Sequence, residues 1–77
     1  MFSQNSGVVF VEVEEAAANG GLLFPVEHGR WALLGTTDSG RLLRIILGPT
    51  RQGVWWVVTA MPMVAAGDRR IWRRHKG

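Results

Sequence analysis

The sequence predicts a small α+β domain with an N-terminal helix, a meander of three or four antiparallel strands and a basic C-terminal helix. Three observations lead to this fold class. A segment near the N-terminus is rich in alanine and glutamate, which favour helix. The middle of the chain alternates β-forming runs with turn sequences. Five of the nine Lys and Arg residues lie in the last ten positions, and the 77 residues fit one domain over 1–77.

The first element permits two interpretations. The segment Val8–Val13 alternates apolar and polar residues, as a half-buried strand does. A helical spacing of apolar residues runs instead from Val9 to Ala17, and Asn19-Gly20-Gly21 follows it as a stop signal. Because three alanines and three glutamates favour helix, we expect a helix from about Phe10 to Ala18.

Three β-forming segments follow the expected helix. The first, Leu22–Val26, contains Pro25, which suits an edge strand because proline cannot donate a ladder hydrogen bond. The second and third, Arg30–Thr37 and Arg41–Leu47, flank Asp38-Ser39-Gly40. That tripeptide indicates a hairpin turn, since glycine accepts the positive φ that such turns need.

The last expected strand, Val54–Met61, follows a turn region over Gly48–Gly53 and has the highest β propensity in the chain. Alternation places Trp55 and Trp56 on opposite faces, so we expect one in the core and the other free to stack or to bind a partner. The expected faces are Val54, Trp56 and Val58 on one side, and Trp55, Val57 and Met61 on the other. The first helix can cover one face; the other needs the C-terminal helix, a partner or a ligand.

The segment from Asp68 to Gly77 gathers positive charge around Trp72 and contains no acid after Asp68. Such a segment indicates a polyanionic partner, and RNA is the leading candidate. Trp72 can stack a base, and Ile71 is expected to face the core. A plainer interpretation is a solubilising helix end whose cations favour the helix dipole. If neighbouring strands extend the basic surface, the nucleic-acid-binding residues are Arg30, Arg41, Arg44, Arg69, Arg70, Arg73, Arg74 and Lys76.

Composition argues against several classes of protein. The chain has no cysteine, and its two histidines, His28 and His75, belong to no metal-binding motif, so we expect neither metal nor cofactor. Either histidine is a candidate proton-transfer group, although solvated surface positions are more common for both. The start of the chain is not typical of a signal peptide, and the apolar run Val54–Ala66 is too short for a membrane span. We therefore expect a cytoplasmic protein.

The run RWALLGTTDSGRLL at Arg30–Leu43, followed by VVTA at Val57–Ala60 and DRRIW at Asp68–Trp72, resembles the BrnT-type toxins of the RelE-like superfamily. The resemblance covers roughly residues 6–74. It implies a compact α/β fold and a small RNA-cleaving toxin held by a small antitoxin protein. It also implies metal-free chemistry on the RNA 2′-hydroxyl, with phosphate bound by the arginine pair Arg69 and Arg70. Together with Arg70, His28 and His75 are the candidate catalytic residues.

Some positions differ from the family pattern. Asn5-Ser6 stands where the family has Lys-His, Met61 stands in place of an arginine, and Trp72 replaces a tyrosine. These differences favour an alternative in which the same fold is a catalytically silent module that binds a protein or a nucleic acid. A DNA-binding component of an operon is a further alternative, but the sequence shows no clear helix-turn-helix.

Overall fold

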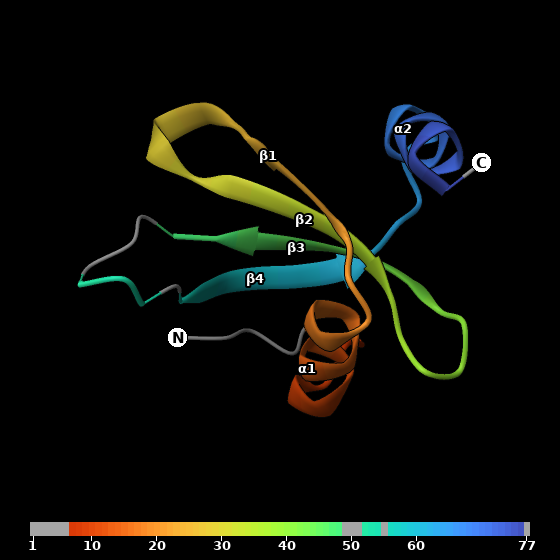
Figure 1. Cartoon of the computed structure of the whole chain (residues 1–77), viewed down its shortest axis with the longest axis horizontal. Helices are drawn as coiled ribbons and strands as arrows, with labels where there is room; N and C mark the ends of the chain where they lie inside the picture. The colour runs from red at the N-terminus through yellow and green to blue at the C-terminus, as the bar shows by residue number, and fades with distance from the viewer. Residues whose placement is uncertain (1–6, 49–51, 55, 77) are drawn as a thin grey trace.

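The computed structural model of the chain describes residues 7–48, 52–54 and 56–76. The element order is α1 (Phe10–Ala18), β1 (Leu22–Pro25), a short 3₁₀ turn η1 (Glu27–Gly29), β2 (Trp31–Thr36), β3 (Leu42–Leu47), β4 (Val57–Pro62) and α2 (Ala66–Lys76). The strands form an antiparallel sheet in the order β1-β2-β3-β4. The two helices lie on opposite faces of this sheet (Figure 1). The predicted α+β class is confirmed.

Helix α1 has the bounds that its composition predicted, and the alternative strand does not form. At its start, the Glu12 carboxylate accepts a hydrogen bond from the Val9 N–H at 3.2 Å, which satisfies a backbone group that the helix leaves unpaired. At its end, Gly20 adopts a φ of 76°, as a glycine after a helix commonly does. Val13 and Ala16 are buried, so this side of the helix packs on the sheet.

The meander follows the predicted turns. The β2–β3 turn contains Asp38-Ser39-Gly40, and the Gly40 N–H donates to the Thr37 carbonyl at 2.9 Å. Strand β1 lies at one edge of the sheet, as its proline predicted, and β4 lies at the other. Each of these outer strands ends in a proline, Pro25 in β1 and Pro62 in β4.

The last strand differs from the prediction. It begins at Val57 rather than Val54, and Trp56 precedes it with 55% of its surface exposed. The pairing then shifts, since Ile46 pairs with Thr59 whereas Leu47 pairs with Val57. This β-bulge interrupts the alternation of side chains. The predicted two faces of this strand were therefore wrong, and Trp55 lies outside the described residues.

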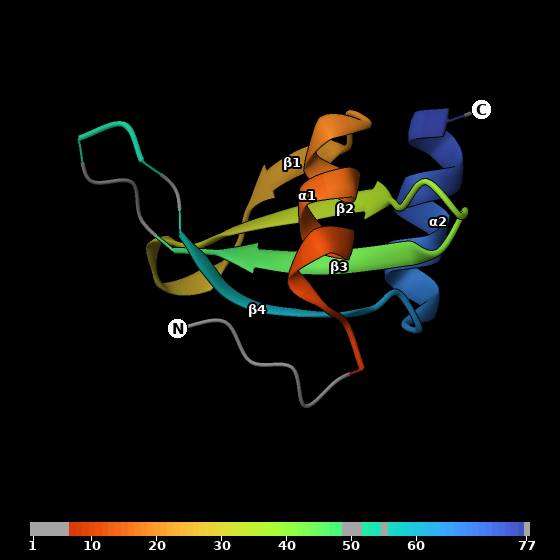
Figure 2. The same ribbon diagram turned by 90° about the horizontal axis from the view of Figure 1, so that it is seen from below.

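Each face of the sheet has its own core. On the α1 face the buried residues are Val8, Val13, Ala16, Leu43, Ile45 and Ala60. On the opposite face they are Leu34, Met63 and Trp72, with Phe24 and Leu42 packed against them. Helix α2 lies at one end of this second face, beside the β2–β3 turn (Figure 2). The second core is therefore small and lies under α2.

The orientation of α2 also differs from the prediction. Trp72 is 6% exposed, whereas Ile71 is 39% exposed. Asp68, one helical turn before Trp72, is buried as well, so these two residues mark the side that faces the sheet. The expectations that Ile71 faces the core and that Trp72 stacks a base were wrong. Within the described residues, no helix is long and apolar enough to cross a membrane.

Candidate functional site

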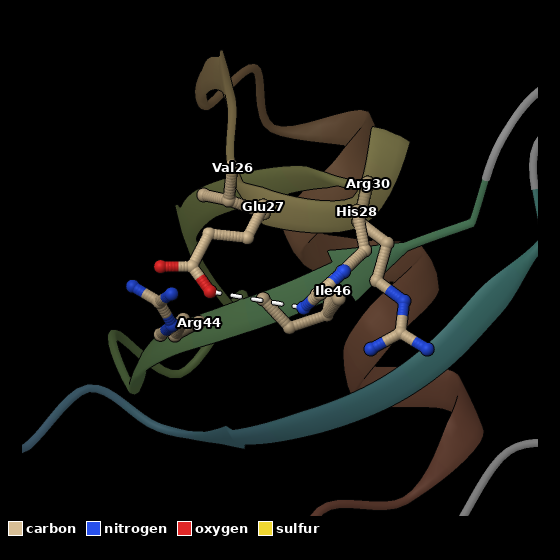
Figure 3. A pocket seen from close by; sticks show the side chains of 6 residues that line it. All are labelled: Val26, Glu27, His28, Arg30, Arg44 and Ile46. Carbon is tan, nitrogen blue, oxygen red and sulfur yellow. Dashed lines mark ion pairs between the residues drawn. The ribbon is translucent and has the colours of Figure 1, made fainter.

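The part of the second sheet face that α2 does not cover contains a hollow of about 500 Å³. We call it the arginine hollow. In Figure 3, Arg44 and Arg30 lie on opposite sides of Ile46, and Glu27 and His28 extend toward the same space from the β1–β2 connection. The full lining is Val26, Glu27, His28, Arg30, Arg44 and Ile46. The hollow thus brings together three residues that the sequence marked for nucleic-acid binding or catalysis.

The β1–β2 connection places Glu27 and His28 above the sheet. The Val26 N–H donates to the Arg30 carbonyl at 2.9 Å, and the Arg30 N–H donates to the Glu27 carbonyl at 3.3 Å, which closes the turn. His28 adopts φ 63° and ψ 33°, a left-handed conformation that is uncommon outside glycine. Histidine, like asparagine and aspartate, adopts this conformation more readily than most residues other than glycine.

The Glu27 carboxylate and the His28 imidazole are neighbours, with Oε2 and Nε2 3.8 Å apart. The His28 side chain is 78% exposed, so the pair is open to solvent and to a ligand. An imidazole can both accept and donate a proton, which makes histidine a common proton-transfer side chain. His28, a candidate proton-transfer group from the sequence, thus lies at the mouth of the hollow.

Arg44 is held by a buried acid. Its Nη1 lies 2.9 Å from Oδ1 of Asp68, in the first turn of α2. Arg44 also lines a second hollow of about 270 Å³ between the end of β4 and the start of α2. It therefore stands on the wall between two concave sites, with its guanidinium oriented by a carboxylate.

The remaining cations form separate groups. Arg41 lies on the α1 side of the sheet, where Nη1 is 2.9 Å from the Glu12 carboxylate and 3.1 Å from the Gly7 carbonyl. It does not extend the surface that carries Arg44. Arg69 donates from Nε to the Met63 carbonyl at 2.9 Å, which ties α2 to the segment before it.

Three exposed arginines of α2 form what we call the arginine stripe. The spacing of Arg70, Arg73 and Arg74 places them on one side of the helix, away from the sheet-facing Trp72. The stripe and the arginine hollow are thus distinct surfaces. The side chain of Lys76 lies outside the described part of the chain.

His75 lies in a different place from His28. Its ring centroid is 5.6 Å from that of Trp72, at an interplanar angle of 43°. It lines a small hollow of about 180 Å³ together with Asn19 and Thr36. The two candidate proton-transfer histidines therefore do not share a site.

Two residues of the site gained a role only from the structure. Asp68 orients Arg44, and Ile46 forms an apolar floor between the two arginines. The sequence did carry a signal for Asp68, because it is the only acid after Asp38. Among the described residues, no three His, Cys, Asp or Glu side chains gather as a metal site would require.

Comparison of the chain with models of protein families, with curated proteins and with solved structures finds no match. The resemblance to BrnT-type toxins therefore stays a prediction from the sequence motifs. The small α+β domain itself, with its four-stranded antiparallel sheet between two helices, is plain from the structure.

Proposed function

We propose that the protein binds RNA and that the arginine hollow holds the phosphodiester backbone. The observation that carries this proposal is the convergence of Arg30, Arg44 and His28 on one hollow. They come from different parts of the chain, since Arg44 belongs to β3 while the other two lie in the β1–β2 connection. A guanidinium donates two parallel hydrogen bonds to phosphate oxygens, which makes arginine the usual residue for this task.

The bound phosphodiester also lies within reach of proton-transfer groups. We extend the proposal to metal-independent cleavage, in which His28 takes the proton of the RNA 2′-hydroxyl. The 2′-oxygen then bonds to phosphorus, the bond to the 5′-oxygen breaks, and the proton passes from His28 to that leaving oxygen. Arg30 and Arg44 would stabilise the negative charge that develops on the phosphoryl oxygens. His75 takes no part in this scheme, because it lies in another hollow.

The proposal is tested with labelled single-stranded RNA in EDTA, following binding and cleavage together at low and moderate salt. We expect salt-sensitive binding that Arg30→Ala and Arg44→Ala weaken, and cleavage that His28→Ala abolishes with little loss of binding. Arg41→Gln is the matched control, since this arginine lies on the opposite face. Equal binding by the wild type and both hollow variants would overturn the proposal. Binding without cleavage would leave a catalytically silent RNA-binding module.

A second candidate function rests on the other side of the molecule. Successive apolar residues at the start of α1, Val9, Phe10 and Val11, are exposed. An apolar surface of this kind suits a small antitoxin-like protein partner. The test is co-purification with the product of an adjacent gene, which Val11→Glu should abolish and Arg30→Ala should leave intact. An apolar complex should also persist in salt that releases RNA.

A further inference from the structure

Trp56 is exposed yet held against the backbone of Gly48. The Gly48 N–H donates to the Trp56 carbonyl at 2.8 Å. A Cβ atom added to Gly48 would overlap Nε1 and Cδ1 of the indole, so the ring lies directly over this glycine. More than half of the residue surface nevertheless remains exposed, at 55%. The indole therefore packs on the Gly48 backbone, while more than half of the residue surface is open to a ligand.

The strand register places Gly48, on which this indole lies, just beyond the end of the β2–β3 ladder that is near Arg30. Trp31 pairs with Leu47 at the end of the β2–β3 ladder, and Arg30 and Gly48 are the chain neighbours of this last pair. Ile46 lies two residues before Gly48, on the same side of the pleated strand. Gly48, under the indole, thus follows Ile46 along the chain, at the end of β3 that lies near Arg30 rather than Arg44.

We propose that Trp56 is a stacking site for an unpaired nucleobase whose phosphate is held by Arg30. This inference rests on the proposed RNA binding and names the form of nucleic acid, since a base within a duplex already has both faces covered. Stacking on an aromatic side chain is tolerant of base identity, because every base has a flat π face. The site therefore selects single strands over duplexes without reading their sequence.

Gly48 provides the space in which the indole lies against the backbone. Any side chain there would displace the ring, so Gly48→Ala should disturb stacking without removing the indole. A ring already packed on the backbone loses less conformational freedom when a base binds, and this preorganisation strengthens binding. Two variants of different chemistry, Trp56→Ala and Gly48→Ala, should then have the same effect.

The test compares two end-labelled oligonucleotides of equal charge, a uridine hexamer and its abasic counterpart, by fluorescence anisotropy. The wild type should bind the base-bearing strand about 5- to 100-fold more tightly. Trp56→Ala and Gly48→Ala should lose that ratio while still binding the abasic strand, and Trp56→Phe should keep part of it. Val54→Ala is the matched control, because Val54 is exposed near Trp56 and contributes no ring.

The outcomes separate the two proposals. Equal affinity of the wild type for both strands, or an unchanged ratio in Trp56→Ala, would overturn the stacking site and leave phosphate binding intact. If Arg30→Ala binds the abasic strand as tightly as the wild type does, the phosphate site is overturned instead. If neither strand binds, both proposals fail. Circular dichroism checks that each variant is folded. If Gly48→Ala does not fold, the comparison of Trp56→Phe with Trp56→Ala tests the stacking site.

Discussion

At the scale of single residues, two arginines near the start of β3 connect the sheet to both helices. Arg41 pairs with Glu12 of α1, and Arg44 pairs with Asp68 of α2. They are three positions apart, and an odd spacing on a strand directs side chains to opposite faces. The same short segment therefore contributes one ion pair to each layer of the domain, and the Arg44 pair also shapes the arginine hollow.

The Glu12 pair predicts a pH dependence of stability. The hydrogen bond from the Val9 N–H, followed by that from Arg41, holds the pKa of Glu12 below its ordinary value of 4.5. A carboxyl group whose pKa is lower in the folded state stabilises the folded protein at pH values above its ordinary pKa. This stabilisation is lost as the pH falls through the folded-state pKa. Between about pH 5 and about pH 3, the free energy of unfolding measured in urea should fall more steeply for the wild type than for Glu12→Gln.

The matched control for this experiment is Glu14→Gln. Glu14 belongs to the same helix and is exposed. Its variant should keep the slope of the wild type against pH. If the free energy of unfolding falls equally with pH in the wild type and in Glu12→Gln, the Glu12 carboxylate is not the source of this pH dependence.

At the scale of the elements, α2 shows where sequence patterns become ambiguous. Ile71 and Trp72 are adjacent apolar residues in a basic segment, about 100° apart around the helix axis. Either can face the sheet if the helix rotates. The choice depends on Asp68, which reaches Arg44 only when Trp72 faces inward, and on the packing of Trp72 against Leu34 and Met63. These contacts join residues distant in the sequence, which periodicity does not reveal.

This orientation predicts a large difference between two neighbouring substitutions. Trp72→Ala removes the aromatic anchor of the second core and should lower the free energy of unfolding by about 3–5 kcal/mol. Ile71→Ala, at an exposed position, should cost less than about 1 kcal/mol. Urea titration of both variants measures the two effects. A greater loss for Ile71→Ala would place the side of α2 that carries Ile71 against the sheet.

Other elements could be predicted because local signals agreed with one another. The bounds of α1 followed from helix-forming residues that end at Asn19-Gly20-Gly21, and the β2–β3 hairpin followed from its turn residues. The start of β4 could not be predicted in this way, since the bulge beside Leu47 depends on how two strands fit together. For the site, residue type marked Arg44 and His28, but only the folded sheet shows that they share a hollow.

At the scale of the whole molecule, two surfaces formed by described residues carry exposed arginines. The arginine hollow lies on the open part of the second sheet face, and the arginine stripe lies on the outside of α2. Both are on the side of the sheet opposite α1, whose first turn carries Glu12. In the RNA-binding function proposed above, a strand longer than the hollow would contact both surfaces while it avoids the acidic helix.

This distribution predicts the salt dependence of binding. Each phosphate contact contributes about −0.7 to the slope of log K against log salt concentration for single strands. Replacing Arg70, Arg73 and Arg74 together by Gln should make the slope less steep by about 2. Arg41→Gln should leave it unchanged, because that arginine pairs with Glu12 on the other face. An unaltered slope in the triple variant would show that RNA does not reach the arginine stripe.

The prolines that end the two outer strands have a consequence for self-association. An open sheet presents unpaired backbone groups along both edges, and these can recruit a strand from another molecule. Pro25 in β1 and Pro62 in β4 each lack the N–H that an added strand would need at that position. Each edge thus carries a built-in interruption to edge-to-edge growth. These interruptions disfavour fibril-like polymerisation through the edges of the sheet.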